Sequence, residues 1–325
     1  MKISIILPTY NNEKTIEECL KSIFMQDFEE KEFEVLFIDG GSSDKTIEIS
    51  KKFPVVFLKN PKRNEEAARI LGIKKAKGEI ITFIDADNVL KEKDWLTRMI
   101  EPFEDKEIAF ADTLYFFYRK NDKIRVKYQA LIGGDDPLVM YLGFYSRWCY
   151  LKSDWTDYPY SFEDKGNFLK IRLKNKNKVP AMGSNGFLVR KYLAKMLIRE
   201  SFIHPDFVFD LVNNGHNCFA KVRIGIVHNQ PKFFPNKIRR IKRRLDKEVT
   251  MKYNYGLTKK NIIKKMIYIG LILPVFYDTI KGFIKKPCLA WSFHPVACFG
   301  EIFLHVFYNL KYIVMPKFKR KENIK

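Results

Sequence analysis

The stretch ITFIDADNVL, residues 81–90, joins an apolar run to two carboxylates that stand one residue apart. Residues 80–84 have the composition of a buried strand, and Asp85 and Asp87 follow that strand directly. Ligands of open α/β sheets bind just beyond the carboxyl ends of the strands. A solvated acidic turn would look the same in isolation, so the meaning of the two carboxylates depends on the rest of the chain.

Up to about residue 110, the chain alternates short apolar runs with segments of helical periodicity. This alternation predicts an α/β fold, Rossmann-like, with a mostly parallel central sheet and helices on both faces. Three of the expected strands end in polar residues, which predicts one pocket at one edge of the sheet. The expected strands cover residues 3–7, 33–38, 55–58 and 79–84, and the expected helices cover 13–25, 45–52 and 65–77.

The composition sets wider limits. A chain of 325 residues with 46% hydrophobic content can form a real core. The formal charge of +21 points to an anionic partner: nucleic acid, a phosphate-bearing substrate or an acidic membrane surface. The five cysteines are scattered without a CxxC pair, so a reducing compartment is expected, without a disulfide framework or a zinc site. The N-terminal segment lacks the features of a signal peptide and is expected to form the first strand.

Three segments carry a family resemblance. They are SIILPTYNNEKTIEECLKSI at residues 4–23, EVLFIDGGSSDKT at 34–46 and NEEAARILGIKKAKGEIITFIDADN at 64–88. In this order and at this spacing, they resemble the inverting GT-A glycosyltransferases of family 2, which include dolichyl-phosphate sugar synthases and cell-surface polysaccharide transferases. Two departures leave the base of the donor open: the chain has Asp-Gly-Gly-Ser at residues 39–42 for the usual Asp-Asp-Gly-Ser, and Ala-Arg-Ile at 68–70 for Ala-Arg-Asn.

The resemblance implies a GT-A fold that binds a nucleotide diphosphate sugar together with a divalent cation, Mg²⁺ or Mn²⁺. Asp87 would serve the metal-bound diphosphate, since hard cations take oxygen ligands and share them with phosphates. His228, in GIVHNQ at residues 225–230, stands where such enzymes often place a histidine on the metal. The remaining nucleotide-sugar-binding candidates are Pro8, Tyr10, Glu13, Asp39, Arg69 and Asp85.

Weaker matches lie in the second half. GSNGFLVRK at residues 183–191 resembles the family's glycine-bearing turn near the acceptor, and HPDFVFDLVNNGH at 204–216 stands in place of its acidic base motif. Asp206 is the candidate general base, with Asp210 in reserve. A base would take the proton of the acceptor hydroxyl as the nucleotide diphosphate leaves. With a lipid phosphate as acceptor, Asp206 would only orient it, and a plain helix cap is the structural alternative. The Gly-Gly-Asp-Asp-Pro turn at 133–137 could face the acceptor or be an ordinary turn.

The C-terminal part is strongly basic and then apolar. Residues 232–265 contain thirteen Lys or Arg and two acids, and the apolar segments 266–284 and 289–315 follow. KIRRIKRRLDKE at 237–248 suits capture of diphosphate or acidic lipid headgroups, or forms a solvated helix. Charges within both apolar segments favour helices lying in the membrane interface, peripheral or monotopic, over a two-pass hairpin, which stays the alternative.

The sequence thus predicts a glycosyltransferase at the cytoplasmic face of the cell membrane, acting with inversion on a lipid-linked or glycan acceptor. Its expected parts are a GT-A catalytic domain at 1–231, divided into a nucleotide-sugar half at 1–110 and an acceptor half at 111–231, a basic helical linker at 232–265 and a membrane-associated tail at 266–325. No nucleic-acid-binding signature is present, so no nucleic-acid partner is expected. A nucleic-acid-binding protein and a nucleotidyltransferase on a related sheet remain the alternatives.

Overall fold

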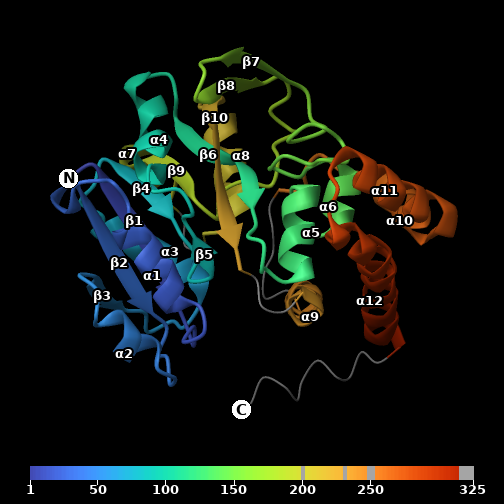
Figure 1. Ribbon diagram of the computed structural model, residues 1–325, viewed down its shortest axis with the longest axis horizontal. Coiled ribbons are helices and arrows are strands. Elements are labelled where there is room, and N and C mark those ends of the chain that lie inside the picture. The colour runs from blue at the N-terminus through green and yellow to red at the C-terminus, as the bar shows by residue number, and fades with distance from the viewer. Residues whose placement is uncertain (199–201, 230–232, 247–252, 315–325) are drawn as a thin grey trace.

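The computed structural model describes residues 1–198, 202–229, 233–246 and 253–314. Within these ranges the centre is a ten-stranded mixed sheet of order β3-β2-β1-β4-β9-β6-β10-β8-β7, in which β5 pairs with β10 (Figure 1). The strands are β1 Ile3–Thr9, β2 Phe33–Asp39, β3 Val56–Lys59, β4 Ile80–Phe83, β5 Asn88–Val89, β6 Phe110–Phe117, β7 Tyr160–Asp164, β8 Phe168–Leu173, β9 Phe187–Arg190 and β10 Cys218–His228.

In the described parts of the chain, twelve α-helices cover the sheet and extend beyond it. Eight precede the basic segment: α1 Ile16–Phe24, α2 Thr46–Ser50, α3 Glu65–Lys75, α4 Trp95–Ile100, α5 Ile124–Ile132, α6 Pro137–Leu142, α7 Lys191–Leu197 and α8 His204–Asn213. Four follow in the C-terminal part: α9 Phe233–Leu245, α10 Lys259–Gly270, α11 Ile272–Lys285 and α12 His294–Val314. Short 3₁₀ helices occur at Glu30–Glu32, Glu101–Glu104 and Leu289–Phe293.

The first four strands are parallel, as the sequence predicts, and the expected strands and helices match within a few residues. β1 pairs with β2 on one side and with β4 on the other. Alternate residues of β1 face opposite layers: Ile5 packs with α1 and α4, whereas Ile6 packs with α3. The approach is close, because a Cβ on Gly72 of α3 would lie 2.6 Å from Ile6. Helices on both faces therefore fix where the ends of these strands lie.

The second half of the sheet departs from the mostly parallel prediction. β9 runs antiparallel to both β4 and β6, and β8 runs antiparallel to β10 and β7. In the part of the sheet that follows β4 in the strand order, only β6 and β10 of the described strands pair in parallel. The other neighbouring strands there run antiparallel. One of these pairs, β7 with β8, is a hairpin, a connection that joins antiparallel strands without a crossover helix. The other antiparallel pairs join segments that are distant in the sequence.

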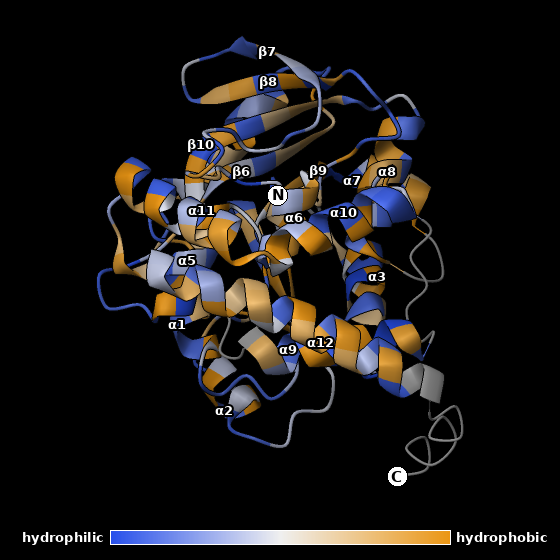
Figure 2. Cartoon of the chain, turned by 90° about the vertical axis from the view of Figure 1, so that its right-hand side faces the viewer, coloured by the Kyte–Doolittle hydropathy of each residue, from blue (hydrophilic) through white to orange (hydrophobic). Residues whose placement is uncertain are grey.

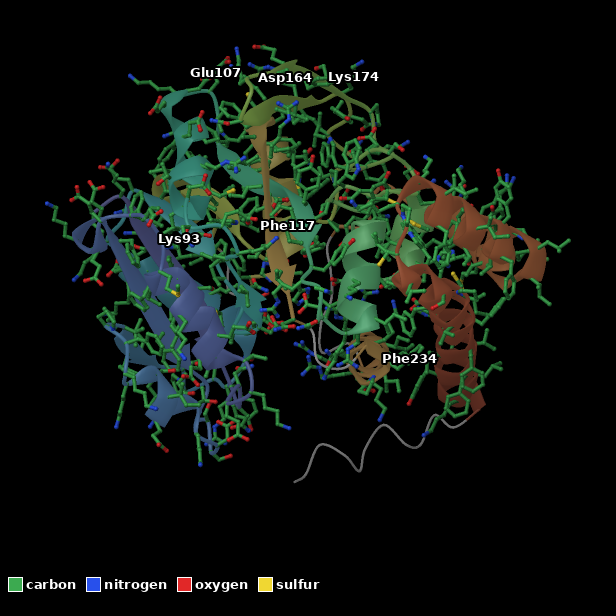
Figure 3. All side chains as sticks on the ribbon, viewed as in Figure 1. Lys93, Glu107, Phe117, Asp164, Lys174 and Phe234 are labelled. Carbon is green, nitrogen blue, oxygen red and sulfur yellow. The ribbon has the colours of Figure 1, made fainter. Side chains whose placement is uncertain are left out.

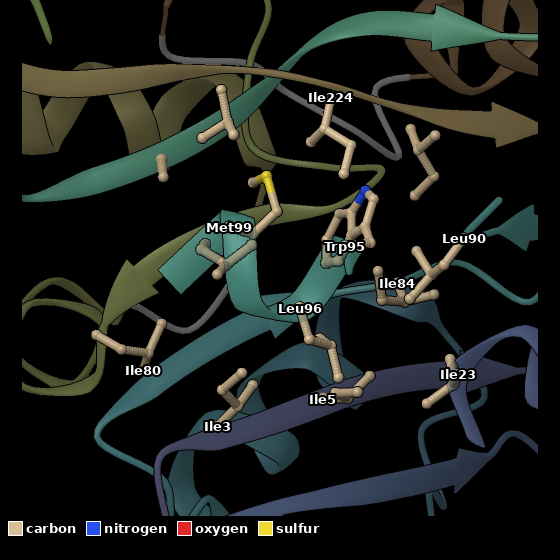
Figure 4. Close-up of a cluster of buried hydrophobic side chains, with 14 of the residues drawn as sticks. Ile3, Ile5, Ile23, Ile80, Ile84, Leu90, Trp95, Leu96, Met99 and Ile224 are labelled. Carbon is tan, nitrogen blue, oxygen red and sulfur yellow. The ribbon is translucent and has the colours of Figure 1, made fainter. Parts of the chain in front are cut away.

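Trp95 joins the two halves of the sheet. Its ring is fully buried among residues of β1, α1 and β10, and its indole N–H donates to Gly225 O at 3.1 Å (Figure 4). Gly186, with φ +84°, allows the ring to approach, since a Cβ there would lie 2.7 Å from it. The parallel half and the antiparallel half thus share one core.

The C-terminal helices pack against α5 and α6 (Figure 1). His294 at the start of α12 is fully buried and joins Tyr128 of α5 (2.7 Å) and Tyr141 of α6 (3.0 Å), and the Tyr141 hydroxyl also donates to Asp278 of α11 (2.7 Å). Burial lowers the pKa of His294 to about 4, so its imidazole is neutral and can both donate and accept.

The predicted apolar segment 266–284 is broken rather than continuous. α10 ends at Gly270, and α11 begins at Ile272 after a bend of 78° between the two helices. Among the described helices none alone is both long enough and apolar enough to cross a bilayer, although α10 and α11 together pass that test as a bent pair. The expectation of C-terminal membrane helices is therefore not supported as single spans.

Candidate active site

The loops that follow β1 and β2 are bonded to each other at one edge of the sheet. Thr9 lies beside Asp39 in the parallel register. The Asn11 backbone N–H donates to Ser42 Oγ at 2.9 Å, and the Ser43 backbone N–H donates to Asn11 Oδ1 at 2.9 Å. These contacts form a single polar rim from two strand ends, which is the arrangement that the sequence predicts for this edge.

Asp39 organises its own turn within this rim. Its carboxylate accepts hydrogen bonds from the backbone N–H of Gly41 (2.7 Å) and from both the backbone N–H (3.0 Å) and the hydroxyl (2.6 Å) of Ser42. Gly41 has φ +90°, a conformation that glycine adopts without steric cost. The contacts give Asp39 an observed structural role, and its contact with a nucleotide base stays a prediction.

The other candidates from β1 differ in position. Pro8 lies within β1 itself, whereas Tyr10 is 57% exposed just beyond it. The Glu13 carboxylate accepts from the Lys45 backbone N–H at 3.3 Å and so joins the rim. Tyr10 is thus free to meet a ligand at the edge of the sheet.

Asp85 is held by a buried arginine. The Arg69 guanidinium, 1% exposed, donates to Asp85 Oδ1 at 2.8 Å and also pairs with Glu65 one helical turn earlier on α3. Burial raises the pKa of Asp85, and the charge of Arg69 opposes that rise. Arg69 holds the pKa of Glu65 far below its usual value. The predicted pair Arg69 and Asp85 therefore lies together, with Glu65 as a partner that the sequence did not single out.

Asp87 and His228 also come together, although 141 positions separate them. The short strand β5 pairs Asn88 with His228, and the Asn229 backbone N–H donates to Asp87 O at 2.7 Å. His228 Nε2 lies 3.6 Å from Asp87 Oδ2, and its Nδ1 lies 4.0 Å from Asp135 Oδ1. Burial lowers the pKa of His228, but the charges of Asp87 and Asp135 outweigh this effect and raise the pKa to about 9. The imidazole is thus a cation between two carboxylates when no metal is bound.

The acidic turn before α6 faces the site rather than solvent alone. Asp136 caps α6 by accepting from the Val139 backbone N–H at 3.0 Å, while Asp135 reaches toward His228. The sequence left open whether this turn faces the acceptor, and its Gly-Gly-Asp-Asp-Pro composition was the only available signal. Burial raises the pKa of Asp135, but the charges of Arg240 and His228 outweigh this effect and keep the pKa below its usual value.

The basic helix α9 lies against these acids. Its cations pair with residues of both halves of the sheet domain: Lys237 with Asp136 at 2.7 Å, Arg240 with Asp135 at 2.8 Å and Arg243 with Glu66 of α3 at 3.1 Å. Lys237 also contacts Glu301 of α12. Three of the thirteen cations counted in the basic segment, Lys232, Lys247 and Lys252, lie outside the described ranges. Part of the predicted anion-capturing charge is therefore engaged with carboxylates of the protein.

The candidate base lies on the first turn of α8. Asp206 Oδ1 accepts from the Tyr253 backbone N–H at 2.8 Å, and Asp210 is buried further along the helix. His204, at the start of α8, places its Nε2 3.8 Å from Glu65 Oε1, within the cluster that also holds Arg69. The turn at 183–186 packs on this helix, because a Cβ on Gly183 would lie 2.9 Å from His204. Whether Asp206 acts as a base stays a prediction.

The donor set can be tested for a divalent cation. In the part of the chain that the structure describes, no group of three or more His, Cys, Asp or Glu side chains could hold a metal ion. Asp87 and His228 supply one oxygen and one nitrogen, and His228 Nδ1 is buried without a hydrogen-bond partner. Cations in phosphate-transfer sites are often bound by one or two protein ligands plus substrate phosphates. The two residues fit a cation shared with a diphosphate.

Comparisons with known proteins place this geometry in a family. The family model described as "Glycosyl transferase family 2" matches residues 4–197. The poly(ribitol-phosphate) beta-N-acetylglucosaminyltransferase TarS of Staphylococcus aureus is 37% identical over 99 residues, which are 29% of this chain and 17% of TarS. A dolichyl N-acetyl-alpha-D-glucosaminyl phosphate 3-beta-D-2,3-diacetamido-2,3-dideoxy-beta-D-glucuronosyltransferase of Methanococcus voltae is 36% identical over 109 residues, 31% of this chain and 34% of that enzyme. The matches thus span a minor part of either relative.

A solved structure extends the likeness to nearly the whole fold. The mannosyltransferase PcManGT of Pyrobaculum calidifontis, in complex with GDP-Man and Mn²⁺, aligns with a TM-score of 0.53 over 95% of this chain and 87% of that chain. The sequence identity is 14%, so this likeness concerns the fold alone.

Proposed function

The chain belongs to glycosyl transferase family 2 and has a GT-A type α/β fold with a mixed central sheet, and from this premise we propose that it transfers a sugar from a nucleotide diphosphate sugar to an acceptor hydroxyl or phosphate. The observation that carries the proposal is the meeting of Asp87 with His228 at the ends of β4 and β10, two residues beyond the Arg69-bound Asp85 and on the same edge as the rim formed after β1 and β2. A nucleotide sugar fits this edge, because it offers a base, a ribose and a diphosphate in sequence.

In this proposal, different residues bind different parts of the donor. Tyr10, Glu13 and Asp39 border the base and ribose. Asp85, fixed by Arg69, accepts from the ribose hydroxyls, and the diphosphate lies toward Asp87 and His228. Asp87 and His228 would hold a Mg²⁺ or Mn²⁺ ion, which when bound neutralises charge on the leaving diphosphate. A metal ion in place of the imidazolium proton of His228 would keep both neighbouring carboxylates balanced.

The acceptor approaches from the side of α8 and the turn at residues 183–186. Direct displacement at the anomeric carbon inverts its configuration, and an acceptor hydroxyl must lose its proton in this step. Asp206 is the proposed proton acceptor because it is the carboxylate of the α8 first turn. For an acceptor that is already an ionised phosphate, the same residue orients the nucleophile instead.

The C-terminal helices support attachment to the cytoplasmic face of the membrane. Large apolar side chains of α10–α12 and of the 3₁₀ helix Leu289–Phe293 are exposed, including Leu273 at 82%, Leu289 at 80% and Ile284 at 77%. Figure 2 shows hydrophobic residues along α11 and α12. Exposed lysines of α10, among them Lys264, add attraction to anionic lipids. This surface fits a lipid interface with acidic headgroups, and hence a lipid-linked or glycan acceptor presented there.

Membrane attachment is tested by cosedimentation with vesicles of phosphatidylcholine and phosphatidylglycerol. The variant Leu273→Glu should reduce the bound fraction severalfold, because a carboxylate would enter the apolar layer. The matched control is Phe162→Glu, on β7 and 56% exposed, which should bind like the wild type. Equal binding by all three proteins, or no binding by the wild type, contradicts the proposal.

Donor recognition is tested by thermal unfolding with UDP, GDP and their sugars, with and without MnCl₂. A ligand at 100 times its Kd stabilises the folded protein by about 2.7 kcal/mol. We expect the sugar nucleotides of one base to raise the midpoint, and Mn²⁺ to increase the shift. If no nucleotide shifts the midpoint while DNA binds with a steep salt dependence, the nucleic-acid alternative replaces this proposal.

A further inference from the structure

A chain of buried amide groups lies directly behind the donor carboxylates. The Asn88 side chain is fully buried and makes three contacts at once. Its Oδ1 accepts from the Asp85 backbone N–H at 3.0 Å, and its Nδ2 donates to Asp87 Oδ1 at 3.3 Å and to Asn185 Oδ1 at 3.0 Å. One side chain thus sets both the backbone of the acidic turn and the rotation of the Asp87 carboxylate.

The orientation of Asp87 follows from these contacts. Asn88 engages Oδ1, whereas Oδ2 is the oxygen that faces His228 at 3.6 Å. A carboxylate held by one oxygen presents the other in a fixed direction. Asn88 Nδ2 divides its two hydrogens between Asp87 and Asn185, so Asn185 completes the contacts that orient the Asn88 amide, together with the Asp85 backbone N–H at Oδ1.

The backbone of Asn185 is held in an uncommon conformation. Its φ is +53°, in the left-handed region that few residues other than glycine adopt. The neighbouring Gly183 and Gly186 also have positive φ, so three residues of this turn share that region. The Arg147 guanidinium bridges the turn by donating to Ser184 O at 3.4 Å and to Asn185 O at 3.2 Å.

Arg147 is in turn anchored in the interior. It donates to Asp112 Oδ2 of β6 at 2.5 Å, and the Lys221 ammonium of β10 reaches the same oxygen at 3.0 Å. Lys221 also donates to Ser146 O at 2.5 Å. None of the three charged residues is more than 2% exposed. Two cations and one anion in the core carry a large desolvation cost, which a purely apolar cluster would not.

We propose that Asn185 is a positioning residue for Asp87, acting through Asn88, and that the cluster Asp112–Arg147–Lys221 holds Asn185 in place. The inference rests on the proposed function, since it assigns Asp87 to the cation that a donor diphosphate shares. Groups that hydrogen-bond a ligating carboxylate typically change metal affinity by about 10–100-fold when removed. In this proposal, the turn at residues 183–186 orients Asp87 Oδ2 toward His228.

The test is the affinity for Mn²⁺ in the presence of UDP or GDP, measured by electron paramagnetic resonance of free Mn²⁺. In Asn185→Gly the backbone keeps its conformation, since glycine adopts positive φ without cost, but the amide contact to Asn88 is lost. We expect the Kd for Mn²⁺ to rise about tenfold or more, while the midpoint of thermal unfolding stays near that of the wild type. Affinity within about twofold of the wild type would overturn the proposal.

Two further variants separate positioning from general damage to the turn. Ser184→Ala removes only the contact from Asn185 Nδ2 to Ser184 Oγ, so Mn²⁺ affinity should stay within about twofold of the wild type. Asn185→Asp retains an oxygen facing Asn88 and should bind Mn²⁺ no more weakly than the wild type. If Asn185→Gly fails to fold, Asn185→Ala, which also lacks that oxygen, replaces it with the same expected loss of affinity. Weakening in Asn185→Asp equal to that in Asn185→Gly would contradict the proposal. If the wild-type protein fails to bind Mn²⁺ in the presence of either UDP or GDP, this result contradicts the proposed function instead.

Discussion

The two halves of the sheet use charged residues in opposite ways. In the parallel half, the two carboxylates that follow β4 stay partly exposed: the Asp85 and Asp87 side chains are 26% and 21% exposed. In the other half, Asp112 and Lys221 lie inside the sheet and are fully buried. The first set is open to a ligand, and the second set has only protein as partner. We therefore expect the buried Asp112 and Lys221 to support the candidate site and the partly exposed Asp85 and Asp87 to form it.

A third kind of charge lies at the end of the sheet away from α9. Figure 3 shows Glu107, Asp164 and Lys174 there, far from Phe234 at the start of α9. Asp164 pairs with Arg223, and Glu107 pairs with Lys170. These pairs are satisfied within the protein at its surface, which distinguishes them from the acids of the candidate site.

The largest effect should come from the strand-end set. Asp87→Asn keeps the size of the side chain but removes the charge that faces His228, so it should lower sugar transfer by about 100-fold or more and abolish Mn²⁺ dependence. Initial rates of nucleotide release at saturating MnCl₂ measure this effect. Unchanged rates would contradict the distinction between the two sets, because Asp87 would then have no more part in the reaction than the buried Asp112.

Asp112→Asn should act on stability rather than on chemistry. It leaves Arg147 and Lys221 buried without an anion, and removal of one partner of a buried ion pair costs about 3–5 kcal/mol. Urea unfolding should show this loss in the free energy of unfolding. A loss below about 1 kcal/mol would mean that the interior charges are not the support proposed above.

The buried Lys221 should make the stability of the protein depend on pH. Burial, only partly offset by Asp112, lowers the pKa of Lys221 to about 7 in the folded protein, whereas an unfolded lysine titrates near 10.5. Between these values the unfolded chain binds more protons, so the stability of the wild type should rise as the pH increases from about 7 to about 10. Relative to Lys221→Met, the gain should be about 2–4 kcal/mol, measured by urea unfolding at several pH values. Parallel pH profiles would contradict the assignment.

The smallest effect is expected at the far end of the sheet. Asp164→Asn breaks an exposed pair with Arg223, and such pairs contribute little to stability. The midpoint of thermal unfolding should stay within about 2 °C of the wild type, and transfer should be unchanged. A large loss of transfer there would show that charge matters at both ends of the sheet.

The parallel half could be predicted from the sequence because its signals are local. Apolar runs of strand length, helical periodicity and polar strand ends each occur within about ten residues of one another. In the structure Arg69 pairs with Asp85, and Asp87 lies beside His228. Their chemical roles stay predictions.

The rest of the site could not be predicted, since it depends on contacts between distant segments. Asn185 sits in a turn that the sequence marks only by its glycines, and nothing near Asp112 indicates that Arg147 and Lys221 will meet it. Likewise, the basic helix reads as free positive charge until Arg240 is seen to pair with Asp135. Burial and partner choice are tertiary properties, and a single sequence carries no direct signal for them.

The central claim is that a donor diphosphate and its cation bind between the ends of β4 and β10. A crystal grown with MnCl₂ and the nucleotide diphosphate that stabilises the protein, measured at a wavelength where manganese scatters anomalously, locates the ion directly. We expect one anomalous peak within bonding distance of Asp87 and His228, with diphosphate oxygens completing the coordination of the ion. A nucleotide bound with its diphosphate elsewhere, or a manganese peak away from both residues, would contradict it.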